Sequence, residues 1–358
     1  MKRLWSDDLS ELEPYSPGEQ MFSRDVIKLN TNENPYPPSQ SALDKIRDKL
    51  HSNLRLYPDP DNFKLKSAIA GLHAIHPESV FVGNGSDEVL AHIFRGLFKK
   101  KKPLLFPDIT YSFYPSYCNL FGIKYNRIKL DANFCIDFRM YNNQCGGIIF
   151  PNPNAPTGIG VKKRDIEAFL HTIDYQVPVV IDEAYVDFGG ESSIPLVKKY
   201  PNLIVSRTLS KSHSLAGLRV GYAIGDADMI EALSRVKNSF NSYPVDALAE
   251  AGAIGALQDS TTLAENSMRI RANRDFLIRE LEKLEFSVLP SIANFVFVER
   301  VGFDGEYLAK RLKEGGILVR NFNNPQRLQP FIRISVGSEI ECKKLINLLG
   351  KIVKSRHI

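Results

Sequence analysis

The stretch NLIVSRTLSKSHSLAGLRVGYAIG, residues 202–225, passes from an apolar run into a loop of small and hydroxylated residues. The run NLIVS (202–206) has the length and composition of a buried strand. Lys211 follows it between Ser210 and Ser212. Most lysines are inert surface residues, but an amine among small polar groups can lose its proton near neutral pH. A neutral lysine amine condenses with an aldehyde to a Schiff base, so Lys211 is a candidate catalytic residue.

Earlier segments repeat this pattern of a short apolar run followed by a polar loop. Four more runs are predicted strands, at residues 79–82, 103–106, 147–150 and 177–181. Longer amphipathic segments separate them, which is typical of an α/β fold with a mostly parallel central sheet flanked by helices. Because ligands bind beyond the carboxyl ends of such strands, the five loops that follow are expected to meet at one site.

The C-terminal third has a different pattern. A long amphipathic helix is predicted from about residue 244 to 284, as a connector between lobes. Strand-like segments in FSVLPSIANFVFVE, GILVR and FIRISVG then alternate with helical ones, which predicts a small α+β domain. At 358 residues the chain exceeds the ~250–300 that one core usually supports. We expect an arm over residues 1–29, a large domain over 30–245, and the connector with the small domain over 246–358.

Composition excludes several classes of protein. No apolar run reaches the ~18 residues of a membrane span, and the N-terminus lacks the apolar core of a secretory signal, which favours a cytoplasmic protein. The four cysteines have no CxxC spacing, and no set of metal ligands stands together, so we expect no metal. The net charge is +5, but acidic residues interleave with the basic ones. A small anionic substrate therefore fits better than nucleic acid.

Two further loops carry candidate binding groups. GNGSDE (83–88) follows a predicted strand and opens a helix, so its free amides could seat a phosphate, although a simple capped helix would look the same. VVIDEAY ends a buried strand at Asp182, with Tyr185 three residues later. An acid beside a core strand needs a cationic partner, unless it merely caps the turn.

These parts together match the needs of one cofactor, pyridoxal phosphate. The cofactor requires an amine for its aldehyde, a carboxylate for its pyridine nitrogen, a donor for its phenolic oxygen, and amides with an arginine for its phosphate. Lys211, Asp182, Tyr185, the start of the helix after Gly85, and Arg219 are the candidates.

Several motifs carry a resemblance to a known family. NPNAPTG, DEAY and SRTLSKSHSLAGLRVGYAIG are similar to the signature segments of the fold-type I pyridoxal-phosphate aminotransferases. NENPYPPS, YPDP, GNGSDE, KNSFNSYPVDALA and ANFVFV narrow the resemblance to the histidinol-phosphate aminotransferases. It extends from about Glu13 to the C-terminal helix, nearly the whole chain.

The resemblance implies roles for individual residues. Lys211 would bond to the cofactor and later shuttle a proton, Asp182 would hold the ring nitrogen, and Tyr185 would donate to the phenolic oxygen. Other matched positions would complete the cofactor site: Tyr111 stacked on the ring, and Ser86, Asp87, Ser210 and Arg219 around the phosphate. The resemblance also implies a homodimer with shared active sites, in which Tyr57 reaches the neighbouring subunit's cofactor and the arm packs on the small domain and the partner. Asn34, Tyr57 and Arg333 would bind substrate, with Arg333 on its anionic end.

One position departs from the family pattern. Many relatives carry an asparagine directly before PTG that contacts the phenolic oxygen, and this chain has Ala155 there. We expect Asn154 or Asn152 to supply the contact; if neither does, Tyr185 acts alone.

The implied reaction is amino transfer between L-histidinol phosphate and 2-oxoglutarate, giving imidazole acetol phosphate and L-glutamate in histidine biosynthesis. Two other activities use the same chemistry and stay open at this point. They are an aromatic amino acid aminotransferase and a phosphothreonine decarboxylase-like enzyme.

Overall fold

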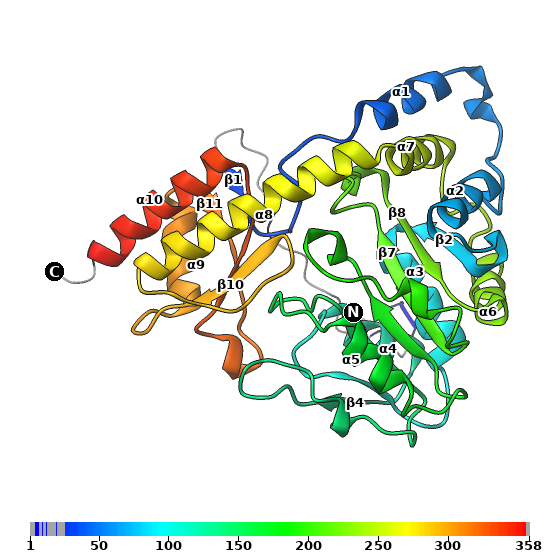
Figure 1. Ribbon diagram of the computed structural model, residues 1–358, viewed down its shortest axis with the longest axis horizontal. Coiled ribbons are helices and arrows are strands. Elements are labelled where there is room, and N and C mark those ends of the chain that lie inside the picture. The colour runs from blue at the N-terminus through cyan, green and yellow to red at the C-terminus, as the bar shows by residue number, and fades with distance from the viewer. Residues whose placement is uncertain (1–3, 7–8, 10–11, 13–18, 20–25, 356–358) are drawn as a thin grey trace.

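The computed structural model describes residues 4–6, 9, 12, 19 and 26–355. Two lobes are visible in Figure 1, joined by the long helix α8 (Ser260–Lys283). Most of the expected arm over residues 1–29 lies outside the described residues. Its described end, the strand β1 (Ile27–Lys28), pairs in parallel with β11 (Ile317–Leu318) of the smaller lobe.

A seven-stranded sheet forms the centre of the large lobe. Strands β7, β6, β5, β3 and β4 run parallel, and β8 lies antiparallel between β7 and β2. The order across the sheet is β2 (Val80–Asn84), β8 (Val220–Ile224), β7 (Leu203–Thr208), β6 (Val179–Asp182), β5 (Gly147–Pro151), β3 (Leu104–Pro107) and β4 (Tyr125–Ile128). The predicted α/β fold with a mostly parallel sheet is confirmed.

Alternate residues of these strands enter two hydrophobic cores, one on each face of the sheet. In β6, Val179 and Ile181 belong to one core and Val180 to the other. Strands buried on both faces read as continuous apolar runs, which is why the sequence showed them clearly. The helices of this lobe are α1 (Gln40–Lys49), α2 (Phe63–His73), α3 (Gly85–Ile93), α4 (Phe113–Phe121), α5 (Lys163–Leu170), α6 (Ala227–Asn238) and α7 (Ala247–Gln258).

The predicted helix over 244–284 is two helices, α7 and α8. Asp259 separates them because its carboxylate accepts from the backbone N–H of Thr262 and starts a new helix. α7 continues through Gly255. A Cβ at this position would lie 2.6 Å from the carbonyl of Ser41, so glycine lets α7 pack closely on α1. Since Ala249 and Ala253 of α7 belong to a large-lobe core, we propose that the lobes divide near Asp259.

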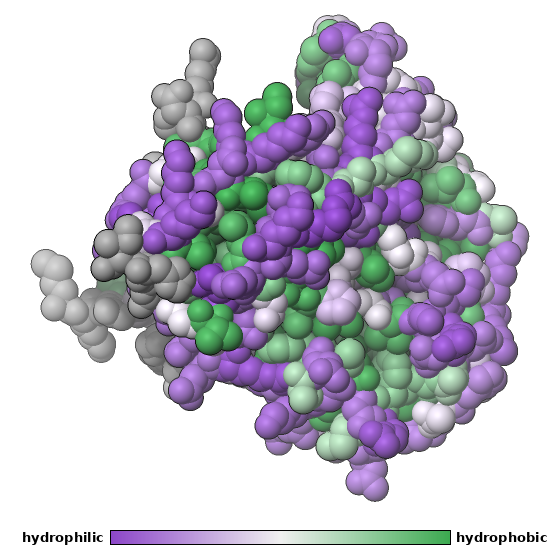
Figure 2. Space-filling model, turned by 60° about the vertical axis from the view of Figure 1, so that its left-hand side comes forward, coloured by the Kyte–Doolittle hydropathy of each residue, from purple (hydrophilic) through white to green (hydrophobic). Residues whose placement is uncertain are grey.

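The small lobe packs α8, α9 (Gly305–Glu314) and α10 (Glu339–Ser355) around a separate core of its own. Its antiparallel sheet has the order β12 (Arg320–Asn321), β13 (Ile332–Ser335), β10 (Phe295–Glu299) and β9 (Ser287–Val288). On the face in Figure 2, hydrophilic side chains form most of the protruding surface and hydrophobic ones show between them. Within the described part of the chain, no helix is both long and apolar enough to cross a membrane.

Candidate active site

The carboxyl ends of neighbouring strands bring the candidate groups together. The strand pairing sets Asp182 of β6 beside Pro151 of β5 and Ser206 of β7. Lys211 follows three residues after the end of β7. The acid and the amine therefore meet at the same edge of the sheet, as the loop pattern predicted.

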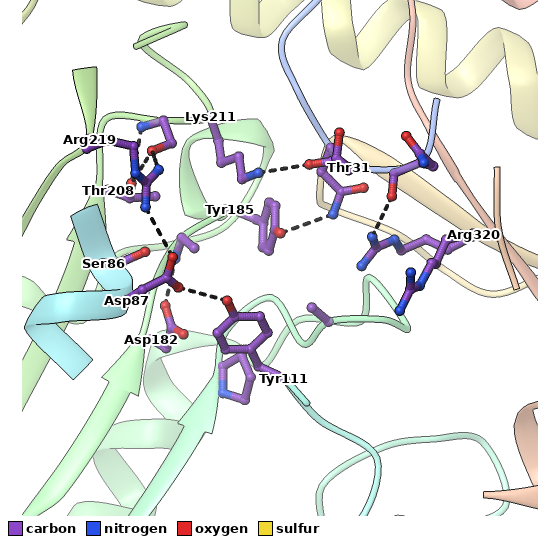
Figure 3. A pocket seen from close by; sticks show the side chains of 17 residues that line it. Thr31, Ser86, Asp87, Tyr111, Asp182, Tyr185, Thr208, Lys211, Arg219 and Arg320 are labelled. Atoms are coloured by element: carbon purple, nitrogen blue, oxygen red, sulfur yellow. Dashed lines mark hydrogen bonds and ion pairs between the residues drawn. The ribbon is translucent and has the colours of Figure 1, made fainter. Parts of the chain in front are cut away.

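A cavity of about 210 Å³ opens at this edge, between the two lobes (Figure 3). The large lobe provides most of its wall, and the segment before α1 and two strands of the small lobe complete it. Its lining consists of Asn30, Thr31, Asn32, Ser86, Asp87, Tyr111, Pro151, Ala155, Asp182, Ala184, Tyr185, Thr208, Ser210, Lys211, Arg219, Arg320 and Arg333.

The Lys211 amine lies in this cavity and donates to the carbonyl of Thr31 at 3.0 Å. Burial, followed by the positive charge of Arg333, lowers the pKa of Lys211 from 10.5 to about 8. The carboxylates of Glu33 and Asp87 act in the opposite direction. A substantial share of the amine is neutral near pH 8, which is the form that attacks an aldehyde.

Asp182 lies in the buried floor of the cavity. Burial raises its pKa from 3.8 to about 7, although the Tyr114 hydroxyl donates to Oδ2 at 3.1 Å and the Ala184 N–H donates to Oδ1 at 3.3 Å. Burial also raises the pKa of Tyr114 well above its ordinary value, so this phenol stays a proton donor. Such a carboxyl favours a bound cation, which would restore its ionised form.

The start of α3 forms the end of the cavity nearest Arg219. The Arg219 guanidinium lies 3.1 Å from Asp87 Oδ2, and the Tyr111 hydroxyl donates to Asp87 Oδ1 at 2.8 Å. Gly85 has a φ of +77°, and a Cβ there would lie 2.9 Å from the Arg219 Cζ atom. Glycine therefore lets the guanidinium lie against the first turn of α3, where free N–H groups and a positive charge suit an anion.

Hydroxyl groups from the lysine loop border the same end. The Thr208 hydroxyl donates to Ser210 Oγ at 3.0 Å and accepts from the Ser210 N–H. Ser210 Oγ also lies 3.5 Å from an Arg219 nitrogen. Ser86, Ser210 and Thr208 all line the cavity, and the hydroxyls of Ser86 and Ser210 can donate to an anionic group there.

A buried ion network holds the lysine loop against the DEAY loop. Arg207, which is 7% exposed, pairs with both Glu183 and Asp187. The Ser212 hydroxyl donates to the second Asp187 oxygen. Because Ser212 adjoins Lys211 and Glu183 adjoins Asp182, this network fixes the backbone on which the two groups stand.

Two arginines face the cavity from the small lobe. Arg333 of β13 and Arg320 of β12 are paired across the strands, and both line the cavity. Arg333 also donates to the carbonyl of Asn30 at 3.1 Å. Figure 3 shows Arg320 across the cavity from Arg219, so positive charge stands at both ends.

The structure places four predicted residues outside the cavity lining. The Asn154 amide donates to the carbonyl of Ile109 and to Thr157, and the Asn152 amide exchanges two bonds with the backbone of Val161. Neither amide group is directed into the cavity. The Asn34 amide donates to the backbone carbonyl of Lys211 at 3.0 Å.

Tyr57 is the fourth such residue. Its side chain is 82% exposed, and its ring stacks on Tyr243 at 4.7 Å. It lies on the surface of this subunit rather than in its own cavity.

Sequence reasoning missed several cavity residues. Thr31, Asn32 and Arg320 line the cavity but were not among the predicted site residues. Tyr114 was missed as the partner of Asp182. Two of these residues had a signal in the sequence: Asn32 opens the motif NENPYPPS, and Arg320 ends the apolar segment GILVR at a predicted strand of the small domain.

Comparison with known proteins agrees with this geometry. Residues 24–349 match the model of the family Aminotransferase class I and II. The chain belongs to the class I and II aminotransferase family. It is 54% identical over 347 residues to histidinol-phosphate aminotransferase 2 of Thiobacillus denitrificans, covering 97% of each chain. It is 52% identical over 349 residues to histidinol-phosphate aminotransferase 1 of Pseudomonas aeruginosa, covering 98% of this chain and 99% of the other.

Solved structures share the fold. The histidinol-phosphate aminotransferase from Clostridium acetobutylicum has a TM-score of 0.85 at 26% identity, covering 92% of this chain and all of the other. That from Sinorhizobium meliloti, in complex with pyridoxal-5'-phosphate, has a TM-score of 0.88 at 24% identity, covering 99% and 98%.

Pyridoxal phosphate is the cofactor of this family, and the cavity fits it. Lys211 provides an amine for the aldehyde. Asp182 provides a buried carboxyl with a raised pKa, and a positively charged pyridine nitrogen beside it would stabilise its ionised form. The α3 terminus with Arg219 provides an anion site at one end of the cavity, suited to the phosphate.

The pKa of Lys211 predicts how cofactor capture depends on pH. In cofactor-free protein, the rate of forming a borohydride-reducible bond to pyridoxal phosphate should rise with pH and level off above a midpoint near 8. Arg333→Gln removes a positive charge that lowers this pKa, so the midpoint should move to higher pH. Arg235→Gln, on the exposed side of α6, is the control and should leave the midpoint in place. An unchanged midpoint in Arg333→Gln would contradict the assigned cause.

Proposed function

We propose that this chain transfers an amino group between L-histidinol phosphate and 2-oxoglutarate, with pyridoxal phosphate as cofactor, in histidine biosynthesis. The observation that carries the proposal is identity above 50%, over nearly the whole chain, to several proteins named histidinol-phosphate aminotransferase. Two arginines beside the reactive amine support it, because both substrates carry anionic groups.

Each residue around the cavity has a separate role in the proposed reaction. When bound, pyridoxal phosphate supplies an electron sink for the carbanion chemistry of amino transfer. Lys211 can take and return a proton beside the substrate carbon, because its depressed pKa makes the neutral amine accessible. Asp182 would hold the ring nitrogen, and Tyr114 keeps its carboxyl oriented. Tyr111 is fixed by its bond to Asp87, which suits a stacking role.

Arg320 and Arg333 are proposed to bind the anionic end of the substrates. A wider hollow of about 900 Å³ adjoins the cavity and shares Tyr111, Arg320 and Arg333 with it. Two guanidinium groups at this junction suit a phosphate, which accepts several charge-assisted hydrogen bonds. A neutral aromatic ring at the same place would form no ion pair with either guanidinium group.

A steady-state comparison of amino donors tests this function. With 2-oxoglutarate as acceptor, kcat/KM for L-histidinol phosphate should exceed that for L-phenylalanine by at least about 100-fold, because a phosphate accepts more charge-assisted hydrogen bonds from two guanidinium groups than the single carboxylate of phenylalanine does. Higher kcat/KM for phenylalanine would assign an aromatic aminotransferase instead. Release of carbon dioxide from phosphothreonine would assign a decarboxylase.

A homodimer with shared sites is part of the proposal. Large apolar side chains are exposed along two neighbouring segments that carry Tyr57 and Tyr243: Leu50, Leu54, Leu56, Tyr57, Phe63, Phe240 and Tyr243. A buried lysine ties the segments together, since Lys237 donates to the carbonyl of Pro60 at 2.6 Å. Such a surface is typical of a protein–protein interface. A second copy covering it would accept Tyr57 near its own cavity.

Mixed dimers test the sharing of sites. A dimer of one Lys211→Ala chain and one Tyr57→Phe chain should contain one doubly altered site and one intact site, if Tyr57 crosses the interface. We therefore expect the purified mixed dimer to show about half the wild-type kcat. If each Tyr57 serves its own chain, the mixed dimer will show only half the activity of the Tyr57→Phe parent. The Lys211→Ala parent dimer provides the baseline.

A further inference from the structure

The segment from Leu29 to Asn32 runs along the small lobe next to the cavity. The backbone N–H of Ser335, at the end of β13, donates to the carbonyl of Leu29 at 2.9 Å. Arg333, two residues earlier in the same strand, donates to the carbonyl of Asn30 at 3.1 Å. The segment is thus fastened to the strand that presents Arg333 to the cavity.

The next two residues contact the large lobe. The carbonyl of Thr31 accepts from the Lys211 amine, and the Asn32 amide donates to the Tyr185 hydroxyl at 3.0 Å. Figure 3 shows the first contact, from Lys211 on the large-lobe side to Thr31 on the segment. Four consecutive residues therefore connect β13 to two groups that face the cofactor cavity.

Asn32 is held more tightly than its neighbours. It is 1% exposed and has a φ of +56°, a left-handed conformation that asparagine tolerates better than most residues. Its backbone N–H donates to Ser335 Oγ at 2.8 Å, and its carbonyl accepts from the Asn294 amide at 3.0 Å. The Ser335 hydroxyl donates in turn to Asn32 Oδ1 at 3.0 Å. With Oδ1 facing Ser335, the NH₂ group must face Tyr185.

This orientation decides what the Tyr185 hydroxyl can do. A phenol carries one proton, and here its oxygen already accepts a hydrogen bond from Asn32. Its own proton is therefore free to be donated into the cavity that Tyr185 lines. A donor in that position stabilises an anionic oxygen, such as the phenolic oxygen of the cofactor.

On the wall of the cavity that carries Ala155, no side-chain amide is placed to donate to the phenolic oxygen of the cofactor. Ala155 lines the cavity with a methyl group, and Asn152 and Asn154 direct their amides to other partners. Support for a donor at Tyr185 therefore comes from the segment before α1.

We propose that Asn32 is a positioning residue for amino transfer, which acts through Tyr185 by orienting its hydroxyl as a donor to the cofactor. Because Ser335 and Asn294 hold Asn32, the same contact links the cofactor side of the cavity to the small lobe. The inference rests on the proposed function, since it requires bound pyridoxal phosphate.

Absorbance titration of the cofactor-bound protein tests the inference. Loss of a donor to the anionic oxygen makes the conjugated chromophore more basic, so Asn32→Gly should raise the pH midpoint of its visible absorbance by about one unit. Glycine accepts the left-handed backbone, so the segment keeps its path. Tyr185→Phe should raise the midpoint at least as far, and the double variant should match Tyr185→Phe alone. Asn202→Ala is the control, because it removes a buried amide that donates to the carbonyl of Val177 outside the cavity lining: it should lower the melting temperature but leave the midpoint in place.

Three outcomes would overturn the inference. The first is an unchanged midpoint in Asn32→Gly together with a lowered melting temperature, which assigns Asn32 a structural role only. The second is an undiminished effect of Asn32→Gly in the Tyr185→Phe background, which excludes action through Tyr185. The third is a wild-type protein that binds no pyridoxal phosphate, which would contradict the proposed function as well.

A second variant covers the case in which Asn32→Gly does not fold. Asn32→Asp keeps the volume of the side chain and the acceptor for Ser335, and it enters the same double-variant comparison.

Discussion

Replacing Lys211 with alanine is expected to lower kcat by at least about four orders of magnitude while leaving the protein folded. In the proposed mechanism the amine bonds to the aldehyde and moves the proton, so one change would remove both functions. The fold should persist because the loop is held by Asn34, which bonds to the Lys211 backbone carbonyl, and by the Ser212–Asp187 contact. Turnover with histidinol phosphate and circular dichroism would measure the two effects.

Lys211→Arg provides the matched control. It retains a positive charge but stays protonated, because the pKa of arginine exceeds about 12. Both variants should fail to retain radiolabel after treatment with pyridoxal phosphate and tritiated borohydride, whereas the wild type should incorporate one label per chain. Catalysis by Lys211→Arg at more than one hundredth of the wild-type rate would contradict the role of the neutral amine.

Asp182→Asn is expected to reduce kcat/KM by about 10²–10³-fold, the usual loss when one preorganised electrostatic contact is removed from an active site. The carboxylate would no longer stabilise a positive ring nitrogen. Tyr114→Phe is the control, because it keeps the charge and removes only one hydrogen bond to it. Its loss of activity should be at least tenfold smaller.

Asp182→Asn should also stabilise the protein against unfolding when no cofactor is bound. Burial raises the pKa of Asp182 from 3.8 to about 7, so the native state holds this proton more tightly than the unfolded chain. The cost of the buried charge is absent at low pH, grows as pH rises from about 4 to 7, and is complete above 7. Asp182→Asn should therefore exceed the wild type in free energy of unfolding by up to about 4 kcal/mol at pH 8. Urea titrations should show this advantage shrinking toward pH 5; a constant difference would contradict the assigned pKa.

Local sequence pattern predicted most of the fold because the parallel strands are buried on both faces. The strands β2, β3, β5, β6 and β7 read as apolar runs and were all expected. β8 was not expected as a strand, since it contains Gly221, and its place between β2 and β7 depends on contacts distant in sequence. A Cβ at Gly221 would lie 2.8 Å from the carbonyl of Gly85, so the residue that weakens the strand signal is required by close packing against the first turn of α3.

The site was predictable where its residues follow strands in motifs. Lys211, Asp182, Tyr185 and Arg219 stand in such loops, and all four line the cavity. Asn32 could not be predicted, because its role depends on Tyr185, which is 153 positions away in the chain. The motif NENPYPPS drew attention to Asn34 instead, whose amide supports the lysine loop from outside the cavity.

A single-turnover experiment tests the central claim most directly. Cofactor-loaded protein is mixed with L-histidinol phosphate in the absence of 2-oxoglutarate, and the absorbance and products are followed. We predict loss of the visible absorbance of the aldehyde cofactor with formation of one equivalent of imidazole acetol phosphate per site, and recovery of the absorbance when 2-oxoglutarate is added. No spectral change with histidinol phosphate, together with a full change with phenylalanine, would contradict the assignment.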